Sequence, residues 1–337
     1  MLISVIVPTY RNTKEEIERC LKSIYQDRFT DFEVFLADDG NTAEYAAYLD
    51  TLAVRFARLR ILHLPHGGVS AARNAAIAEA NGDYIILVDA DDELTVQFWE
   101  DVKEISARGI KADIIYGMIP NSMGYIGSDK ESAPHSFWEL TEEEKQELYA
   151  VFIGMKRIRF WLEDGHISRG PVARLVRKEL AKKSPFRTNL ALCEDIIWNL
   201  DLLCDNPDVF VSDYVWYRIA QNPESAARRY REDRIERLRE FLYVLRSYKT
   251  KETETGYRQM VFECIRDVGV NYYLLPQNPL PWFQKVRAFN RVIYSEPFCD
   301  AYKLSVKSDG VKDRLKITLS KMGLLLYVYK LKMLLRK

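Results

Sequence analysis

Residues 82–92 read Gly-Asp-Tyr-Ile-Ile-Leu-Val-Asp-Ala-Asp-Asp, an apolar run that ends directly in a group of carboxylates. Its five apolar or aromatic residues in succession predict a strand covered on both faces. At the carboxyl end of such a strand an open α/β sheet usually binds its ligand. Asp89 and Asp91 form an Asp-X-Asp pair there. Such a pair can hold a divalent cation against a diphosphate, because a hard cation takes one or two carboxylates and completes its shell with phosphate and water oxygens.

Strand and helix patterns alternate before this stretch. A helix with capping-box form follows Thr13, with Glu16 three residues on and apolar residues at helical spacing behind it. Pro8 is expected to end the first strand. This alternation predicts βαβ units around a mostly parallel sheet. The other predicted elements are strands at 3–7, 33–37, 59–64 and 84–89, a turn at Gly67-Gly68 and a helix at 69–80.

The pattern becomes less regular after about residue 100. Beyond residue 224 the sequence is helical and rich in charge, which predicts a boundary near residue 225. The elements expected before that boundary are a helix at 96–107, a strand at 112–117, an irregular loop at 121–135, helix from 141 to the region of 161, a helix at 190–204 and a strand at 209–217.

The composition limits the classes of partner and compartment. Lys plus Arg and Asp plus Glu are 49 each, so no net charge would attract nucleic acid. The five cysteines are scattered without CxxC pairs, which fits a reducing cytoplasm better than a disulfide framework. No run approaches the roughly 20 apolar residues that a membrane-spanning helix needs. We expect a cytoplasmic protein, and the sequence leaves a homo-oligomer open.

A second acidic pair follows an earlier strand. Asp38 and Asp39 come after the strand at 33–37 and should lie in the same sheet as Asp89 and Asp91. Strand ends are often acidic only because they are solvated, so either pair alone fits an exposed turn equally well. Crowded carboxylates raise each other's pKa unless a metal or a basic group offsets them. Two acidic pairs in one α/β sheet therefore favour a nucleotide and metal site.

A glycine turn at Gly67-Gly68 opens the helix at 69–80, which carries Arg73 in its first turns. Free N–H groups at a helix N-terminus bind anions, and a guanidinium suits a phosphate or a pyrimidine carbonyl. The alternative is an arginine that faces solvent on a surface helix.

Four motifs come in a particular order: SVIVPTY at 4–10, ADDGN at 37–41, GVSAARN at 68–74 and DADD at 89–92. In this order and spacing they resemble family 2 glycosyltransferases, bacterial inverting enzymes of the polysaccharide-synthesis type with the GT-A fold. The resemblance covers residues 1–225 and implies an α/β, Rossmann-like domain with a mostly parallel mixed sheet flanked by helices. Residues 1–100 would be its nucleotide-sugar-binding half and 101–225 its acceptor-binding half. Residues 226–337 would form a helical C-terminal region.

The resemblance also implies roles for individual residues. Asp38 or Asp39 would bind the uracil or ribose. The choice stays open because the family more often has Val before this pair and Ser after the glycine. Asp91 would ligate Mg²⁺ or Mn²⁺ bound to the diphosphate. The other nucleotide-sugar-binding residues would be Pro8, Thr9 and Tyr10 at the nucleoside, Arg73 at the base and diphosphate, and Asp89 with Ala90 at the ribose or sugar.

A further acidic pair, Glu194 and Asp195, begins a largely apolar helix. Poor solvation raises a carboxyl pKa toward that of a useful base, although the helix dipole alone also favours an acid at this place. In family 2 enzymes an Asp here is taken as the base that deprotonates the acceptor hydroxyl. The resemblance therefore implies Asp195 as the catalytic base, with Glu194 as support.

Two more residues are acceptor-site or supporting candidates by resemblance. Arg174 lies in a segment that shapes the acceptor site in the family, where Lys is more usual. Trp216 lies in a strand whose following loop closes over the donor, and its ring or that of Tyr217 could stack on a sugar. Packing of an aromatic residue in a strand is an equally good account of Trp216.

The C-terminal segment is basic, with eight Lys or Arg in residues 312–337 against one acid, Asp313. Its apolar residues form one helical stripe flanked by Lys330 and Lys332, as expected for a helix on an anionic membrane surface. Leu326, Tyr329 and Met333 interrupt the polar face, and a helix docked on its own domain or on a partner chain is an equal alternative. The stripe consists of Leu324, Tyr327, Val328, Leu331, Leu334 and Leu335.

These observations predict a metal-dependent glycosyltransferase that moves a sugar from a nucleotide diphosphate, expected to be UDP. The acceptor would be a hydroxyl of a glycan or lipid-linked glycan, with peripheral contact to the inner membrane surface. One rival is a sugar nucleotidyltransferase, but that class has a glycine-rich loop after the first strand and residues 8–12 contain no glycine. The other is a catalytically silent partner in a polysaccharide assembly complex, which would not need Asp195.

Overall fold

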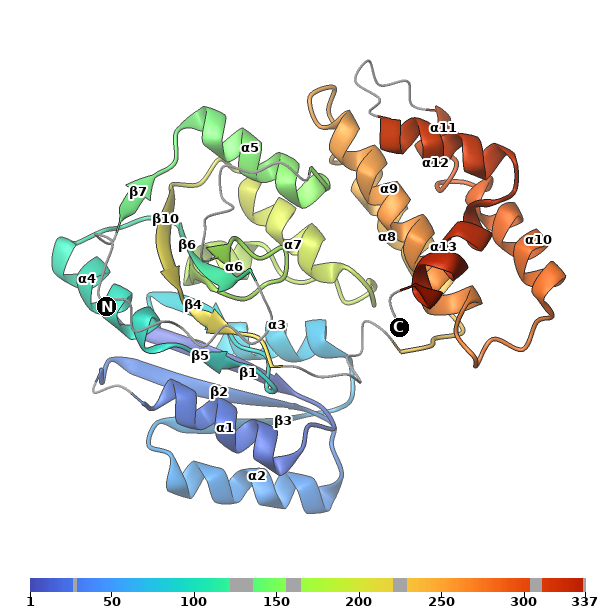
Figure 1. Ribbon diagram of the computed structural model, residues 1–337. Coiled ribbons are helices and arrows are strands. Elements are labelled where there is room, and N and C mark those ends of the chain that lie inside the picture. Colours follow the sequence, from blue (N-terminus) through green and yellow to red (C-terminus); the bar gives the residue numbers. More distant parts are fainter. Residues whose placement is uncertain (27–28, 122–135, 156–164, 221–228, 304–310, 336–337) are drawn as a thin grey trace. The chain divides into compact units, whose positions relative to one another are not determined.

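The computed structural model describes residues 1–26, 29–121, 136–155, 165–220, 229–303 and 311–335 (Figure 1). The chain forms two compact units, residues 1–149 with 158–221 and residues 150–157 with 222–337. The boundary expected at residue 225 and nearly all of the loop expected at 121–135 lie outside the described residues.

The described residues of the first unit form a mixed sheet of nine strands in the order β3-β2-β1-β4-β9-β6-β10-β7, with β8 paired to β6. The four strands of its N-terminal half are parallel to one another, whereas β9 runs antiparallel to both of its neighbours. The predicted α/β class with a mixed sheet is thus confirmed. The strands are β1 Ile3–Thr9, β2 Phe32–Asp39, β3 Leu59–Leu64, β4 Tyr84–Leu87, β6 Ile114–Pro120, β7 Phe137–Glu139, β8 Gly165–His166, β9 Arg174–Arg177 and β10 Val209–Val215.

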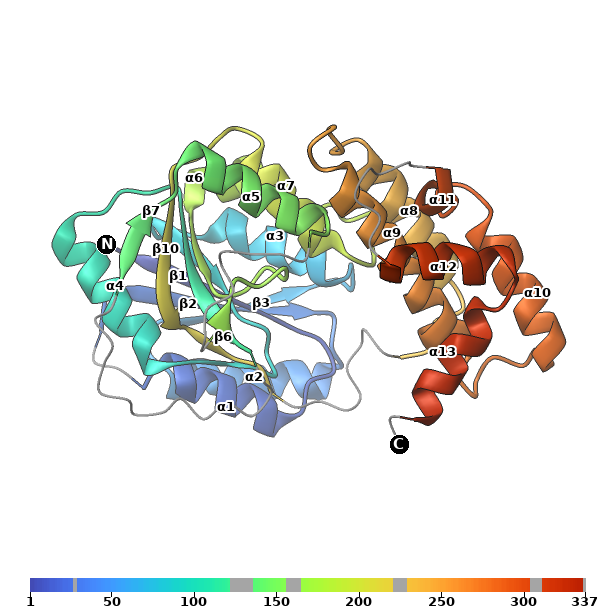
Figure 2. The ribbon, with the colours of Figure 1, turned by 45° about the horizontal axis from the view of Figure 1, so that its top comes forward.

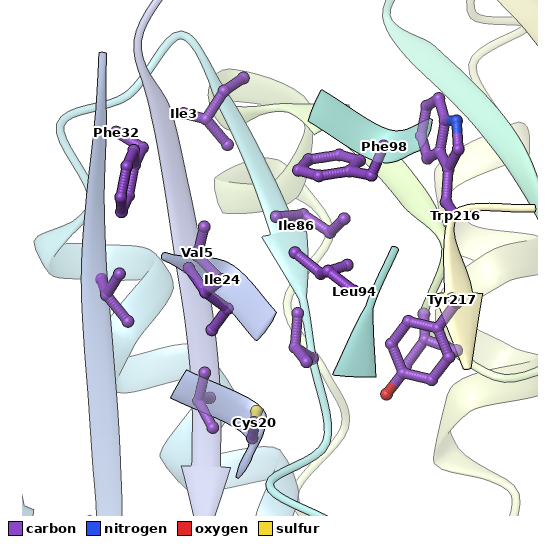
Figure 3. Packing of buried hydrophobic residues seen from close by; sticks show 14 of the residues in the cluster. Ile3, Val5, Cys20, Ile24, Phe32, Ile86, Leu94, Phe98, Trp216 and Tyr217 are labelled. Carbon is purple, nitrogen blue, oxygen red and sulfur yellow. The ribbon is translucent and has the colours of Figure 1, made fainter. Parts of the chain in front are cut away.

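Helices cover both faces of the parallel half (Figures 1 and 2). Because side chains alternate along a strand, Ile3 and Val5 of β1 join a core with helix α1, Lys14–Ile24, as Figure 3 shows. Helix α3, Val69–Glu79, packs on the other face of β1 and β2. Further helices of this unit are α2 Ala43–Arg55, α4 Val96–Arg108, α6 Lys178–Lys183 and α7 Glu194–Leu203; α5 Glu142–Ile153 crosses into the second unit.

Helix α1 begins with the predicted capping box. Thr13 Oγ1 accepts from the N–H of Glu16 at 3.1 Å, and the Glu16 carboxylate accepts from the N–H of Thr13 at 2.9 Å. The expectation that Pro8 ends the first strand is wrong, because β1 continues to Thr9 and Pro8 pairs with Ala37. Pairing of β1 with β4 stops at Ile6, so Pro8 has a neighbour on one side only and its missing N–H costs little there.

Trp216 follows β10 and lies entirely inside the first unit. Its ring is 0% exposed, packs edge-on to Phe98 at 5.3 Å, and donates its N–H to Asp101. Figure 3 shows the Trp216 ring beside Phe98, with Tyr217 directed the other way. The suggestion that Trp216 stacks on a sugar is therefore wrong, and the alternative of aromatic packing holds.

Gly117 of β6 lies directly against this indole. A Cβ at this position would be 2.1 Å from Trp216 Cδ2, which no ring movement within a packed core relieves. We expect Gly117→Ala to lower the free energy of unfolding by about 1–3 kcal/mol, measured by urea denaturation. In a Trp216→Ala background the same change should cost almost nothing further, and an equal cost in both backgrounds would contradict this contact.

The second unit is helical, as predicted for the residues beyond 224. No helix among the described residues has the length and apolar character to cross a bilayer. The elements of the second unit are α8 Arg234–Arg246, α9 Glu254–Val268, a π-helical turn Gly269–Tyr273, α10 Trp282–Ile293, α11 Asp300–Lys303, α12 Val311–Lys321 and α13 Leu325–Leu334.

Candidate active site

The carboxyl ends of β1 and β2 are in register, with Thr9 opposite Asp38. The Asp38 side chain is 3% exposed, and both of its oxygens are hydrogen-bonded within the protein. Oδ1 accepts from the N–H and Nδ2 of Asn41 at 2.9 and 2.8 Å, and Oδ2 lies 2.8 Å from His63 Nδ1. Asn41 Nδ2 also reaches the Thr9 carbonyl at 3.3 Å. Asp38 therefore fixes the turn that follows β2, and Asn41 in that turn links it to the end of β1.

Asp39 fixes the glycine turn before α3. Its Oδ1 accepts from the N–H groups of Gly67 and Gly68 at 2.7 and 3.1 Å, and its Oδ2 lies 3.0 Å from His66 Nδ1. Glycine at position 40 lets the turn after β2 approach His66 closely, because its φ is +74° and a Cβ there would lie 2.6 Å from the main-chain nitrogen of His66. Both carboxylates of the pair thus hold loops at the edge of the sheet.

Tyr10 is the exposed member of the predicted nucleoside group, since Pro8 and Thr9 are buried. Its ring is 37% exposed and stacks on His66, with centroids 4.4 Å apart and planes 19° from parallel. The Arg11 guanidinium lies 4.9 Å from the Tyr10 ring centroid. This edge of the sheet therefore presents an aromatic surface with a cation beside it.

The Asp-X-Asp segment follows β4 and is held by a short pair of strands, β5 Glu93–Leu94 with β11 Tyr217–Arg218. That pairing brings the Tyr217 hydroxyl to the N–H of Asp89, which donates to it at 2.9 Å. Ala90 is 3% exposed. The Asp91 carbonyl accepts from Arg19 at 2.6 Å, so the main chain of the segment is fixed on two sides.

Asp92 shows how much negative charge gathers here. Its side chain is buried and accepts from the N–H of Ala220 at 2.8 Å. Burial, followed by the charges of Asp89 and Asp91, raises the pKa of Asp92 to about 7. A cation at this point would offset the repulsion.

The ligand groups at this strand end suit a hard divalent cation that takes most of its coordinating oxygens from outside the protein. They are carboxylate oxygens, the ligands that Mg²⁺ and Mn²⁺ prefer. No group of three His, Cys, Asp or Glu among the described residues converges as a complete cage. Asp91 could hold such an ion, with phosphate and water oxygens as the remaining ligands.

Arg73 connects this segment to helix α7. Its side chain is 5% exposed and forms ion pairs with Asp89 at 3.0 Å and with Glu194 at 3.2 Å, residues 105 positions apart in the sequence. Burial lowers its pKa, but the charges of Asp89 and Glu194 outweigh burial and raise the pKa of Arg73. The alternative of a solvent-facing Arg73 is wrong. The structure places it between the acidic strand end and the helix of the expected base.

Asp195 lies beside this bridge, in the first turn of α7. The turn begins at Cys193 with a left-handed φ of 60°, which is why the helix starts four residues later than the predicted 190. Burial, followed by the Glu194 charge, raises the pKa of Asp195 to about 7, while Arg73 acts in the opposite direction. A carboxyl with this pKa can accept a proton near neutral pH.

Arg174 is buried against the loop at residues 168–172, in which Gly170 lies near the Asp195 carboxylate. Its guanidinium donates to the carbonyls of Ser168, Gly170 and Val172 and lies 4.8 Å from the Tyr116 ring centroid. At 1% exposure it has no surface for an acceptor, so only a supporting role remains for it.

Asn199 lies one helical turn after Asp195 and is not among the site residues predicted from the sequence. Its Nδ2 donates to the carbonyls of Asp195 and Arg169 at 2.8 and 3.0 Å and joins α7 to the same loop. The i, i+4 spacing from Asp195 was its only sequence signal. Tyr217 is 0% exposed, so the suggestion that its ring stacks on a sugar is wrong, as for Trp216. The contact of its hydroxyl with Asp89 was not predicted, because that contact depends on the β5–β11 pairing.

The family model described as glycosyl transferase family 2 matches residues 4–183. The uncharacterized glycosyltransferase EpsJ of Bacillus subtilis is 29% identical over 231 residues, which are 66% of this chain and 62% of EpsJ. The glycosyltransferase GlyG of Streptococcus pneumoniae is 27% identical over 218 residues, 64% of this chain and 69% of GlyG. The chain thus matches less than two thirds of the length of EpsJ.

Among solved structures, S. aureus TarS 1–349 superposes with a TM-score of 0.59 over 96% of this chain and 88% of that one. At 19% identity this likeness concerns the fold alone. The family match covers more than half of the chain and includes the strand ends, Arg73 and the Asp-X-Asp segment. The chain therefore belongs to glycosyl transferase family 2.

Proposed function

We propose that this protein transfers a sugar from a nucleotide diphosphate to a hydroxyl of a glycan or lipid-linked glycan, with inversion at the anomeric carbon. The observation that carries the proposal is the Arg73 bridge, which joins Asp89 of the Asp-X-Asp segment to Glu194, the residue next to Asp195. Structures of TarS in complex with UDP and with UDP-GlcNAc support UDP as the nucleotide.

In this proposal the donor lies across the carboxyl edge of the sheet. The exposed Tyr10 ring would lie against the base, and Arg11 beside it would add a positive charge near the nucleotide. Asp91 would hold Mg²⁺ or Mn²⁺, which when bound would neutralise charge on the diphosphate. Arg73 would keep Asp89 oriented toward the ribose or sugar, since its guanidinium is already shared between two carboxylates.

The chemical step is a single displacement. The acceptor oxygen forms a bond to the anomeric carbon while the bond from that carbon to the diphosphate oxygen breaks, and the diphosphate leaves with the electron pair. Asp195 takes the proton of the acceptor hydroxyl and becomes neutral. Its pKa of about 7 suits this role, because a base is most effective when its pKa lies near the working pH.

The raised pKa of Asp195 leads to a prediction for the pH profile. The base must be ionised to act, so activity should be lost as pH falls below about 7, roughly tenfold for each pH unit. The measurement is kcat/KM for the nucleotide-sugar donor between pH 5 and 9 at saturating Mn²⁺. A profile that stays level down to about pH 5 would show that no group with this pKa takes the proton.

The proposal is tested by incubating the protein with UDP-sugars, Mn²⁺ and candidate acceptors and measuring the UDP released. Acceptor-dependent UDP release supports the transferase. Formation of UTP from UDP-sugar and pyrophosphate would instead identify a sugar nucleotidyltransferase. If neither occurs with any of UDP-glucose, UDP-galactose and their N-acetyl forms, while one of them still binds, the protein is a silent partner.

A further inference from the structure

Helix α13 is docked on its own unit by one face. Leu325 and Leu326 are 1% and 0% exposed, and Tyr329 packs edge-on to Phe289 at 6.4 Å. A Cβ on Gly269 would lie 2.7 Å from the Tyr329 ring, so the π-helical turn approaches this helix closely. Two of the residues that interrupt the predicted polar face, Leu326 and Tyr329, are thus the ones that attach the helix.

The opposite face of α13 carries a second apolar stripe that remains exposed. Leu331, Leu334 and Leu335 are 57%, 61% and 77% exposed, and Tyr327 is 45% exposed. These residues recur at intervals of three or four, so they lie on one side of the helix. A row of large apolar side chains left in water is unfavourable unless something covers it.

Helix α10 extends this surface. The Trp282 ring packs edge-on to Tyr327 at 5.0 Å, and Phe283 next to it is 69% exposed. The Lys330 ammonium lies 4.1 Å from the Trp282 ring centroid. The exposed stripe of α13 and the start of α10 therefore form one apolar surface, which we call the α10–α13 face; both helices are seen in Figures 1 and 2.

The charges on the α10–α13 face are all positive. Burial and the neighbouring Lys330 charge lower the pKa of Lys285, which shows that two ammonium groups lie close together. Lys285, Lys330 and Lys332 form no ion pair within the described part of the chain, and neither α10 nor residues 314–335 contain an acid. Such a cluster would be stabilised by an anionic partner.

We propose that the α10–α13 face binds the surface of an anionic lipid bilayer. Exposed leucine and phenylalanine side chains would enter the region between headgroups and acyl chains, tryptophan and tyrosine suit that interface, and the lysines would contact lipid phosphates. A second copy of the chain fits less well, because a two-fold contact of this face with itself would bring like charges together. The proposal concerns a surface of the second unit and does not depend on the sugar-transfer activity.

The test is sedimentation of the full-length chain with vesicles of phosphatidylcholine alone or with about 30% phosphatidylglycerol, in the absence of donor and acceptor. We expect binding to the anionic vesicles only, weakened at 0.5 M salt because the charges are exposed. Leu331→Asp combined with Leu334→Asp should abolish binding. Lys330→Gln and Lys332→Gln should weaken it about fivefold each. The matched control is Val54→Asp in α2, an exposed apolar residue (90%) of the first unit, which should bind as the native chain does.

Circular dichroism and a thermal melt of each variant establish that a loss of binding is not a loss of fold. Equal binding to neutral and anionic vesicles, or none to either, would overturn the proposal. So would a dimer in light scattering that the paired Leu331 and Leu334 substitutions convert to a monomer, since the occupant of the face would then be a second copy. Because no donor is present, the outcome is separate from that of the UDP-release assay.

Discussion

Replacing Asp195 by asparagine should lower the rate of sugar transfer by about 10²- to 10⁴-fold, the usual contribution of a positioned general base. Asparagine has nearly the same shape and can still accept the hydrogen bond that the Ile196 N–H donates to Oδ1 at 2.8 Å. It cannot take the acceptor proton at any working pH. The loss should therefore appear in kcat, measured by UDP release at saturating donor, while the affinity for UDP stays within about twofold.

The same variant provides its own test of folding. The folded protein binds the Asp195 proton more tightly than the unfolded chain does, since the pKa rises from 3.8 to about 7. The ionised carboxylate therefore costs stability that increases as pH rises from about 4 to 7. Asp195→Asn removes this cost, so at pH 8 it should be at least as stable as the native chain. Native turnover in a folded Asp195→Asn protein would show that another group is the base.

Replacing Arg73 by methionine should affect both stability and the pH profile. Removal of one partner from a buried ion pair leaves its carboxylates uncompensated, and here Asp89 and Glu194 both lose their cation. Because the Asp89 side chain is 38% exposed, we expect the lower end of the usual range, about 3 kcal/mol, from urea denaturation at pH 8. The Asp195 pKa should rise further, since the Arg73 charge opposes its rise, and the acid limb should move to higher pH.

Two further variants separate the bridge from simple loss of packing. Arg73→Lys keeps the charge but has no planar fork to share between two carboxylates, so it should recover only part of the stability. Glu194→Gln added to Arg73→Met removes one uncompensated charge and should restore part of the loss, which a double-mutant cycle measures. If the two changes were additive, Arg73 and Glu194 would not be coupled and the account of the bridge would be wrong.

The sequence predicted those features that depend on local patterns. The capping box at Thr13, the strand at 59–64 and the start of α3 at Val69 follow from side-chain spacing within a few residues, and the structure has each of them. The convergence of Arg73 with Glu194 and Asp195 could be inferred only from the resemblance to a family, because the Arg73–Glu194 ion pair spans more than a hundred residues.

What the sequence did not reveal depends on which way a side chain points. Trp216 directly precedes the short strand β11, which begins at Tyr217, and both side chains are buried. They point to opposite sides, so the indole packs on Phe98 whereas the Tyr217 hydroxyl accepts from the N–H of Asp89. The sequence alone allows either side chain to face Asp89, and only the pairing of β11 with β5 decides which one does. Arg174 was assigned to the acceptor side for a similar reason, since a sequence does not show that its charge is surrounded by main-chain carbonyls.

The most direct test of the central claim is calorimetric titration of UDP into the native chain and into Asp91→Asn, each with Mn²⁺ and with EDTA. The claim is that a nucleotide diphosphate and a divalent cation bind together at the Asp-X-Asp segment. It predicts that UDP binds the native chain at least tenfold more tightly with Mn²⁺ than with EDTA and that Asp91→Asn loses this difference. Equal UDP affinity of the native chain with and without the metal would contradict it.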